Sequence, residues 1–311
     1  MLTVIGEALV DEVLRPGQPV APHVGGSPLN VAVGLARLGH PVQFLGRFGQ
    51  DPYGDMVAAH LSANGVMVPL VPDSQATSIA RATLDADGAA SYDFALDWSL
   101  PASLATGSSA VMLAATTLLH TGSIATMLAP GAEQVLSAVL HAHPHATISY
   151  DPNCRPSIIA DVAYAREQAE KFVRLADVVK ASDEDLQWLY PDVDPKESAR
   201  AWLAMGGTEG PAVVVVTQGG EGPWAVCAAA EVACAAPSVE VADTVGAGDS
   251  FMAALLSALV DRELDGAQRR AELRALSAEQ LAEVLAYAAR AAAITVSRAG
   301  ANPPSRAELQ Q

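Results

Sequence analysis

The sequence predicts a single α/β domain over residues 1–311, built on a doubly wound, mostly parallel β-sheet with a small β-sheet lid. Three observations lead to this fold class. Short apolar runs alternate with stretches of helical spacing along nearly the whole chain, which is typical of parallel strands connected by helices. Half of the residues are hydrophobic and 17% are charged, so 311 residues can bury a large core. One segment interrupts this alternation with the period of a β-hairpin.

Buried strands are expected where β-branched residues cluster beside Gly, Pro or Asp. These runs are 2–6, 42–46, 118–122, 146–150, 177–180 and 212–217. Helices are expected in the amphipathic stretches between them, at 27–38, 54–63, 132–141, 163–175 and 199–205. A stretch of mixed charge, 261–280, is expected to be a solvated helix or a long connection. An alanine-rich helix should then run from Ala278 to about Val296, before Pro303 and Pro304 prevent further helix.

The hairpin lies in residues 77–96, where apolar and polar residues alternate on both sides of Asp87-Gly88. A hairpin inserted into an α/β chain does not readily join the parallel sheet. We expect it to form an accessory sheet with a segment near the N-terminus, so that the lid comprises insertions at about 12–22 and 75–98. Accessory sheets of this kind often act as lids. A surface hairpin without function is the alternative.

Charge and composition exclude several classes of function. The formal net charge is −17 and the chain has no basic stretch, so nucleic acid would be repelled. No run of about 18 apolar residues predicts a membrane span. The N-terminus lacks the basic region of a signal peptide and is expected to be the first strand. The three cysteines form no CxxC pair, which favours reduced thiols in a cytoplasmic protein.

The stretch DTVGAGDS, residues 243–250, places two glycines directly before an apolar run of helical spacing. A helix that starts near Asp249 presents unpaired N–H groups, and Gly246 and Gly248 allow the backbone to close around a phosphoryl group. A carboxylate at such a place is explained if it takes the proton from an attacking hydroxyl. The stretch lacks the Gly-Lys-Ser/Thr of a Walker A loop and the third glycine of a dinucleotide fingerprint. The alternative is that Asp249 only caps the helix.

A second glycine pair, Gly25-Gly26, precedes Ser27 and Pro28 in GGSPLN, which is a natural helix start. Asn30 would then lie in the first turn, where its amide can both donate to and accept from a sugar hydroxyl. Asp11 follows the first strand in GEALVD and could accept two more hydroxyl protons. Open α/β sheets bind their ligands at this end of the strands.

These two stretches resemble the two signatures of the ribokinase-like, or PfkB, carbohydrate kinases. The resemblance extends along nearly the whole chain, and its DPNCRP and GANPP segments are most similar to the fructokinase branch. It implies an enzyme that transfers the γ-phosphoryl group of ATP to a primary hydroxyl of a small neutral sugar, most of all fructose. Ribokinase and 2-keto-3-deoxygluconate kinase are the alternatives within the family. A catalytically silent regulatory relative is expected to lack Asp249 or the anion-hole glycines, and no glycine fingerprint supports a dinucleotide-dependent oxidoreductase.

The resemblance also implies roles for individual residues, with ATP, Mg²⁺ and often K⁺ as cofactors. The catalytic base would be Asp249, and the amides of the anion hole would come from Gly246, Ala247 and Gly248. The sugar would be held by Asp11, Gly26, Asn30 and Arg155. The ATP site would contain Thr217, Gly219, Gly222, Ser182 and Asp185. The monovalent cation would be held by Asp243 and by backbone oxygens of Val245, Thr295, Arg298 and Gly300. Relatives often form homodimers through the lid.

The chain departs from the family pattern at several of these places. The family's Asn-x-x-Glu motif, which helps organise magnesium and phosphate, is here Ser182 to Asp185, with a carboxylate one methylene shorter. An asparagine near the adenine aligns with Arg290, and a serine among the cation ligands aligns with Pro304. The Tyr-Arg that follows the lid hairpin in many relatives is absent from residues 93–96, which removes a natural partner for a substrate carboxylate.

Other candidate residues have a less specific pattern. The three histidines of HAHPH, residues 141–145, suggest metal, but their short connection around Pro144 favours a solvated loop. Trp98 near the lid suits either a sugar face or a hydrophobic anchor. Trp188 and Trp202 have helical neighbours and are expected in the core.

Overall fold

The computed structural model describes residues 1–14, 19–84, 90–100 and 108–310. Its main sheet has eight strands in the order β12-β11-β10-β9-β8-β7-β1-β4. Neighbouring strands from β10 to β4 pair in parallel, and β11 and β12 add antiparallel pairs at one edge. The strands are β1 Leu2–Ile5, β4 Val42–Leu45, β7 Leu118–Gly122, β8 Thr147–Asp151, β9 Val178–Ser182, β10 Val213–Thr217, β11 Pro223–Cys227 and β12 Glu231–Ala233. The predicted doubly wound, mostly parallel fold is confirmed.

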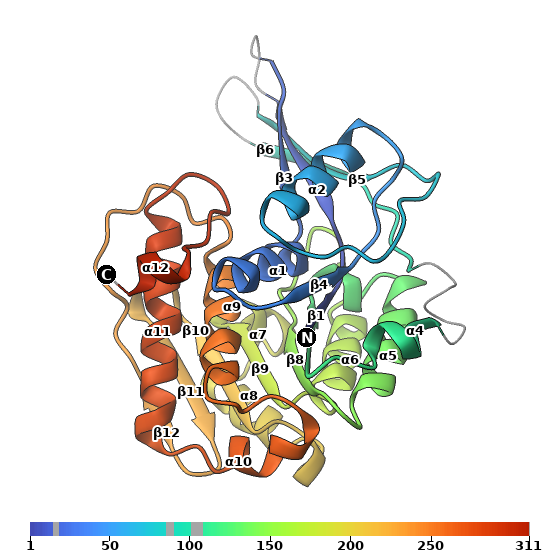
Figure 1. The fold of residues 1–311 in the computed structure, drawn as a ribbon. Coiled ribbons are helices and arrows are strands. Elements are labelled where there is room, and N and C mark those ends of the chain that lie inside the picture. Colours follow the sequence, from blue (N-terminus) through green and yellow to red (C-terminus); the bar gives the residue numbers. More distant parts are fainter. Residues whose placement is uncertain (15–18, 85–89, 101–107, 311) are drawn as a thin grey trace.

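Helices cover both faces of this sheet (Figure 1). Alternate strand residues pack into two separate clusters, as the period of two in a strand requires. One cluster joins the sheet to α1 Ser27–Arg37, α9 Ala247–Val260 and α11 Ala278–Val296. The other joins it to α5 Gly131–Ala142, α6 Val162–Val173, α7 Asp183–Leu189 and α8 Pro195–Leu203. The remaining helices are α2 Pro52–Ala63, α4 Ser108–Leu113, α10 Arg270–Arg274, α12 Arg306–Leu309 and the 3₁₀ turns η1 Ser123–Thr126, η2 Gly207–Glu209, η3 Gly219–Glu221 and η4 Ala267–Arg269.

The predicted accessory sheet is present and projects from the body of the molecule (Figure 1). It has the order β3-β2-β5-β6, with β2 Leu9–Leu14, β3 Ala21–Gly25, β5 Ser78–Leu84 and β6 Ala90–Ala95. β5 and β6 form the expected antiparallel hairpin, and its predicted Asp87-Gly88 turn lies outside the described residues. Because β2 begins at Leu9, the first lid segment starts earlier than the predicted residue 12.

Polar contacts fix the base of the lid to the body. The buried Arg47 guanidinium binds both carboxylate oxygens of Asp73 at 2.9 Å and donates to the carbonyl oxygens of Ala76 and Asp97. These two carbonyls lie where the chain enters β5 and leaves β6. Within the lid, the Glu12 carboxylate of β2 accepts hydrogen bonds from Tyr53 of α2 and Arg81 of β5. Arg47 therefore holds the base of the β5–β6 hairpin, and Glu12 joins β2 to β5 and to α2.

Several predicted boundaries differ from the structure. α2 begins at Pro52 and α8 at Pro195, because proline is well suited to the first turn of a helix. The antiparallel strands β11 and β12 and the short helices α4 and α7 were not predicted. The stretch 261–280 was predicted as a solvated segment, but Arg270 within it forms a 2.7 Å ion pair with the fully buried Asp177. This stretch is therefore anchored in the body of the protein.

The structure also shows where the aromatic residues and histidines considered above lie. Trp98 is buried and donates from Nε1 to the Ala125 carbonyl, so it is a hydrophobic anchor. Trp202 is fully buried, whereas Trp188 is only partly buried at the edge of the core, which corrects its prediction as a core residue. In HAHPH, His145 bonds to the Leu113 carbonyl. Within the described residues, no three His, Cys, Asp or Glu side chains are grouped as metal ligands.

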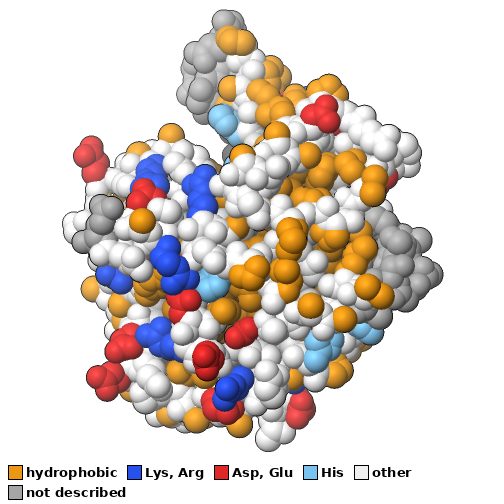
Figure 2. Space-filling model, viewed as in Figure 1, with side chains coloured by type: hydrophobic (Ala, Val, Ile, Leu, Met, Phe, Trp, Pro, Cys, Tyr) orange, Lys and Arg blue, Asp and Glu red, His pale blue; other side chains and the backbone are white. Residues whose placement is uncertain are grey.

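Charged side chains of both signs are mixed on the face of the molecule that Figure 2 shows. On the face shown in Figure 2, Lys and Arg side chains are interspersed with Asp and Glu over the C-terminal helices and form no continuous basic patch. Among the described residues, no helix is long and apolar enough to cross a membrane. The three cysteines are free thiols.

Candidate active site

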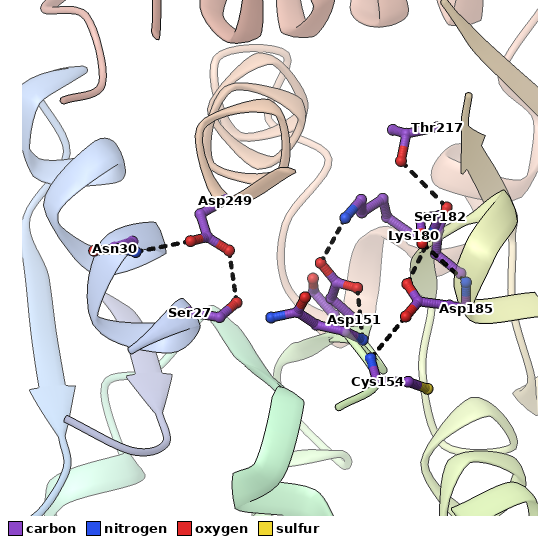
Figure 3. Close-up of polar contacts among 12 residues, drawn as sticks. Ser27, Asn30, Asp151, Cys154, Lys180, Ser182, Asp185, Thr217 and Asp249 are labelled. Carbon is purple, nitrogen blue, oxygen red and sulfur yellow. Dashed lines mark hydrogen bonds and ion pairs between the residues drawn. The ribbon is translucent and has the colours of Figure 1, made fainter. Parts of the chain in front are cut away.

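Two helix N-termini meet at Asp249. It lies in the first turn of α9, and both of its carboxylate oxygens accept hydrogen bonds from the first turn of α1 (Figure 3). Ser27 Oγ donates to Oδ1 at 2.6 Å, and Asn30 Nδ2 donates to Oδ2 at 2.8 Å. The N-cap of α9 is Gly246, and no side chain caps this helix. The interpretation of Asp249 as a helix cap is therefore wrong, and its carboxylate is instead oriented by the opposite helix.

The glycine loop before α9 is bordered by a lysine. The first N–H groups of α9 have no partner within the helix, and the helix dipole favours negative charge there. A Cβ atom added at Gly248 would lie 3.0 Å from the Nζ of Lys180. A side chain at this position would therefore crowd the ammonium group. The loop thus combines backbone amides with a fixed positive charge, an arrangement suited to an anion.

Lys180 belongs to a buried ion pair at the carboxyl ends of β8 and β9. Its Nζ lies 2.9 Å from Asp151 Oδ2, and the two side chains are 5% and 2% exposed. Burial raises the pKa of Asp151 to about 6, although the Lys180 charge opposes this shift. Burial alone would lower the pKa of Lys180, but Asp151, Asp185 and Asp249 outweigh it and raise that pKa above its ordinary value. Lys180 therefore carries its charge at neutral pH.

Asp185 holds two segments together beside this pair. Its Oδ1 accepts from the Cys154 N–H at 2.7 Å, and its Oδ2 accepts from the Ser182 N–H at 2.9 Å. Ser182 Oγ in turn accepts from the Asp185 N–H, which completes a capping box at the start of α7. Thr217 lies opposite Ser182 in the pairing of β10 with β9. Gly219 and Gly222 follow in the turn after β10, so the predicted ATP-site residues come together at this end of the sheet.

The residues predicted to hold the sugar come from β2, the start of α1 and the loop after β8. Burial raises the pKa of Asp11 on β2, while the charges of His23 and Arg155 oppose this shift. The Arg155 guanidinium is exposed and donates to the carbonyl oxygens of Asn153 and Cys154. Gly26 directly precedes α1 as its N-cap. Asn30 donates to Asp249, so its amide orients the carboxylate.

Glu7, which follows β1, carries a buried carboxyl group. Glu7 is 4% exposed at the end of β1, and its Oε2 accepts from the Ala125 N–H at 3.2 Å. Burial raises the pKa of Glu7 to about 7, while hydrogen bonds from Ser123 and Ala125 and the charge of Arg155 oppose the shift. Glu7 thus ties β1 to the turn that follows β7.

The residues predicted to hold a monovalent cation form one structural unit. Asp243 accepts from the N–H of Val245 at 3.0 Å and from that of Gly300 at 2.8 Å, and these bonds lower the pKa of its carboxyl group. The Thr295 carbonyl accepts from the Arg298 N–H, and the Thr295 hydroxyl is buried against Ser250. The unit offers carbonyl and carboxylate oxygens, which are suitable ligands for a hard cation.

Sequence reasoning missed several residues of the site. Ser27 was noted only as part of a helix start, although its spacing of three from Asn30 puts both on one helix face. Lys180 and Glu7 were not singled out, and a charged residue within an apolar strand is the signal that could have identified Lys180. Arg290, aligned with a residue near the adenine, lies on α11 and lines a groove with Asp261 and Arg262.

Comparison with known proteins shows what the chain is similar to. A sequence model of the family described as "pfkB family carbohydrate kinase" matches residues 2–308. A fructokinase from Escherichia coli is 31% identical, and the match covers 99% of this chain and 97% of the relative. A probable fructokinase from Arabidopsis thaliana is 33% identical over 99% of this chain and 91% of the relative. The crystal structure of a fructokinase with bound ATP from Xylella fastidiosa superposes with a TM-score of 0.85 at 26% identity, covering 99% and 96% of the two chains.

Glu7 should make stability depend on pH in a specific direction. Its pKa of about 7 exceeds the ordinary 4.5, so the folded state disfavours the charged carboxylate. The resulting penalty is absent below about pH 4.5, grows as the pH rises and is complete above about pH 7, where it amounts to about 3 kcal/mol. Glu7→Gln should therefore stabilise the protein at pH 8.5 and have little effect at pH 4.5, measured by urea unfolding. Glu12→Gln is the control with the opposite sign, because Tyr53 and Arg81 lower the pKa of Glu12. Equal effects of Glu7→Gln at both pH values would contradict this prediction.

The buried ion pair allows the structural and binding roles of Lys180 to be separated. Lys180→Met should destabilise the protein by about 3–5 kcal/mol, because it leaves Asp151 buried without its partner. Adding Asp151→Asn should recover most of the lost stability, measured by urea unfolding. The KM for ATP should be raised in both the single and the double variant, because both lack the charge of Lys180. Arg200→Met, which breaks an exposed pair with Glu231, should cost less than about 1 kcal/mol. A double variant with a normal KM for ATP would show that Lys180 has only a structural role.

Proposed function

The chain belongs to the pfkB family of carbohydrate kinases and is a sugar kinase, and we propose that it transfers the γ-phosphoryl group of ATP to a primary hydroxyl of a small neutral sugar, D-fructose by preference. The observation that carries this proposal is the Asp249 carboxylate, held by Ser27 and Asn30 where two helix N-termini meet. Relatives named fructokinase, which are 31% and 33% identical over nearly the whole chain, support the choice of sugar.

Asp249 acts as the general base. It accepts the proton of the sugar hydroxyl while the hydroxyl oxygen forms a bond to the γ-phosphorus and the bond between that phosphorus and the ADP oxygen breaks. Its proton then passes to solvent. The bonds from Ser27 and Asn30 hold both carboxylate oxygens in place before substrate arrives, and such positioning is a large part of catalysis in phosphoryl transfer.

The loop before α9 stabilises the moving phosphoryl group. Backbone amides of Gly246, Ala247 and Gly248 and the positive end of the α9 dipole supply fixed partial charges. The Lys180 ammonium beside Gly248 adds a full charge in a site from which water is largely excluded. These local groups act against the overall charge of −17.

The nucleotide is held at the carboxyl ends of β9 and β10. We assign Thr217, Gly219 and Gly222 to the ATP site, with Ser182 and Asp185 beside the phosphates. Asp185 already accepts two backbone amides, which hold its carboxylate in place. Together with Ser182 it would help to hold Mg²⁺, which would neutralise charge on the phosphates. K⁺ at the oxygens around Asp243 would stabilise the anion-hole loop.

The sugar lies between the lid and Asp249. Asp11, Gly26 and Asn30 bind its hydroxyl groups, and Arg155 lies at the edge of this site. The lid closes over the bound sugar and excludes water from ATP. A homodimer through the lid sheet and a cytoplasmic location are part of the same proposal. Ribokinase and 2-keto-3-deoxygluconate kinase activities are the alternatives.

Replacement of the base should affect turnover and spare binding. Asp249→Asn keeps the size of the side chain but removes the proton acceptor, so kcat should fall by about 10² or more. The KM for ATP and for sugar should change little. Asp192→Asn, at an exposed position in a turn, is the control and should retain full activity. Near-normal turnover of Asp249→Asn in a coupled ADP-release assay would rule out Asp249 as the base.

The charge of the site should determine the preferred sugar. Ala80 and Phe94 lie beside Asp11 on the same face of the lid sheet, so the described part of the hairpin offers no cation beside Asp11 to a carboxylate. A poorly paired buried carboxylate costs several kcal/mol, on the order of 10²-fold in specificity. We therefore predict a higher kcat/KM for D-fructose than for 2-keto-3-deoxygluconate, and activity with ribose and tagatose should be assayed alongside. The reverse order in direct competition would overturn the fructose assignment and leave the role of Asp249 intact.

A further inference from the structure

The row of the lid sheet that contains Asp11 also contains a histidine. In the antiparallel pairing of β2 with β3, Asp11 lies directly opposite His23, so the two side chains project from the same face of the sheet. Ala80 of β5 and Phe94 of β6 continue this row. Asp11 and His23 are therefore its titratable residues, and both lie on strands that lead into or out of the sugar site.

The Asp11 carboxylate occupies space that is free because its neighbour Gly25 has no side chain. A Cβ atom added at Gly25 would lie 2.2 Å from Asp11 Oδ2, so the carboxylate occupies the space above this glycine. Gly25 leads directly into α1, which holds Asp249 through Ser27 and Asn30. Asp11 also experiences the charge of Arg155, from the loop that follows β8. Asp11 therefore lies near the chain entering α1 and within range of the charge in the loop after β8.

Asp11 and His23 are neighbours that do not bond to one another. Within the part of the chain that the structure describes, neither the Asp11 carboxylate nor the His23 ring has a hydrogen bond or an ion pair. Other charged groups nearby are engaged, since Glu7 binds the Ala125 N–H and Arg155 binds carbonyl oxygens of its own loop. The sheet therefore presents an adjacent acceptor and donor, both of which are available to a ligand.

We propose that His23 is a specificity-determining residue of the sugar site, and that its imidazole and the Asp11 carboxylate together recognise two neighbouring hydroxyl groups of the sugar. This inference rests on the proposed sugar kinase function. A carboxylate can only accept hydrogen bonds, whereas an imidazole has an N–H donor in either protonation state. Asp11 accepts the proton of one hydroxyl, and His23 donates to the oxygen of the next. The diol lies toward the lid, at the end of the sugar away from the hydroxyl that reacts at Asp249.

The test compares KM for the sugar in His23 variants. His23→Ala removes the donor, so KM for D-fructose should rise roughly three- to tenfold, the cost of one neutral hydrogen bond, while kcat and the KM for ATP remain unchanged. His23→Gln should restore part of the affinity, because its amide also donates. His141→Ala, at an exposed histidine of α5, is the control and should leave KM unchanged. Thermal unfolding should show that His23→Ala is folded, since its side chain is exposed.

Monodeoxy analogues of D-fructose separate a direct contact from a structural effect. For the analogue that lacks the hydroxyl bound by His23, the wild type and His23→Ala should have the same KM. An unchanged KM of His23→Ala for fructose, or a difference that persists with every analogue, would overturn the role of His23 while leaving the kinase function in place. If the wild type prefers another sugar, the same comparison applies to that sugar and its deoxy analogues. A wild type without activity on any sugar would overturn both proposals.

Discussion

The site depends on the meeting of two helix N-termini at one carboxylate. α1 and α9 come from opposite ends of the chain, and both start at the same end of the main sheet. They pack closely, because a Cβ atom at Gly34 of α1 would lie 2.6 Å from the Ala253 Cβ of α9. This contact brings Ser27 and Asn30 within hydrogen-bond distance of Asp249. The positive ends of both helices then point to the proposed site of phosphoryl transfer, where negative charge would move.

A second constraint is the placement of full charges in a protein that is acidic overall. The Lys180 and Asp151 pair lies buried beside the proposed anion-hole loop, where salt screens its attraction much less than at the surface. Asp185 secures the surrounding backbone through the amides of Cys154 and Ser182 (Figure 3). The arrangement separates two tasks, since Lys180 supplies charge while Asp185 supplies rigidity. Arg155 lies at the rim, where its charge reaches Asp11 and Glu7 without a direct bond to either.

The sequence predicted the fold well because the spacing of hydrophobic residues along a segment depends on that segment alone. The parallel strands and the lid hairpin follow directly from it, whereas β11 and β12 depend on pairing at the sheet edge, which no local pattern encodes. The place of Asp249 in the first turn of a helix was predictable from the glycines beside it. Ser27 and Lys180 were not assigned to the site, because their roles arise only when segments far apart in the sequence meet. The ion pair of Arg270 with Asp177 was not predicted for the same reason, since the two residues are 93 positions apart in the sequence.

The most direct test of this account is a crystal structure with ADP, aluminium fluoride, Mg²⁺ and D-fructose, since aluminium fluoride imitates the phosphoryl group in transfer. The account predicts that the fluoride group lies against the amides of Gly246 to Gly248, with Lys180 Nζ within hydrogen-bond distance. The sugar's primary hydroxyl should lie between this group and a carboxylate oxygen of Asp249, in line with the ADP oxygen. A fluoride group bound away from this loop, or a sugar hydroxyl that approaches a residue other than Asp249, would contradict it.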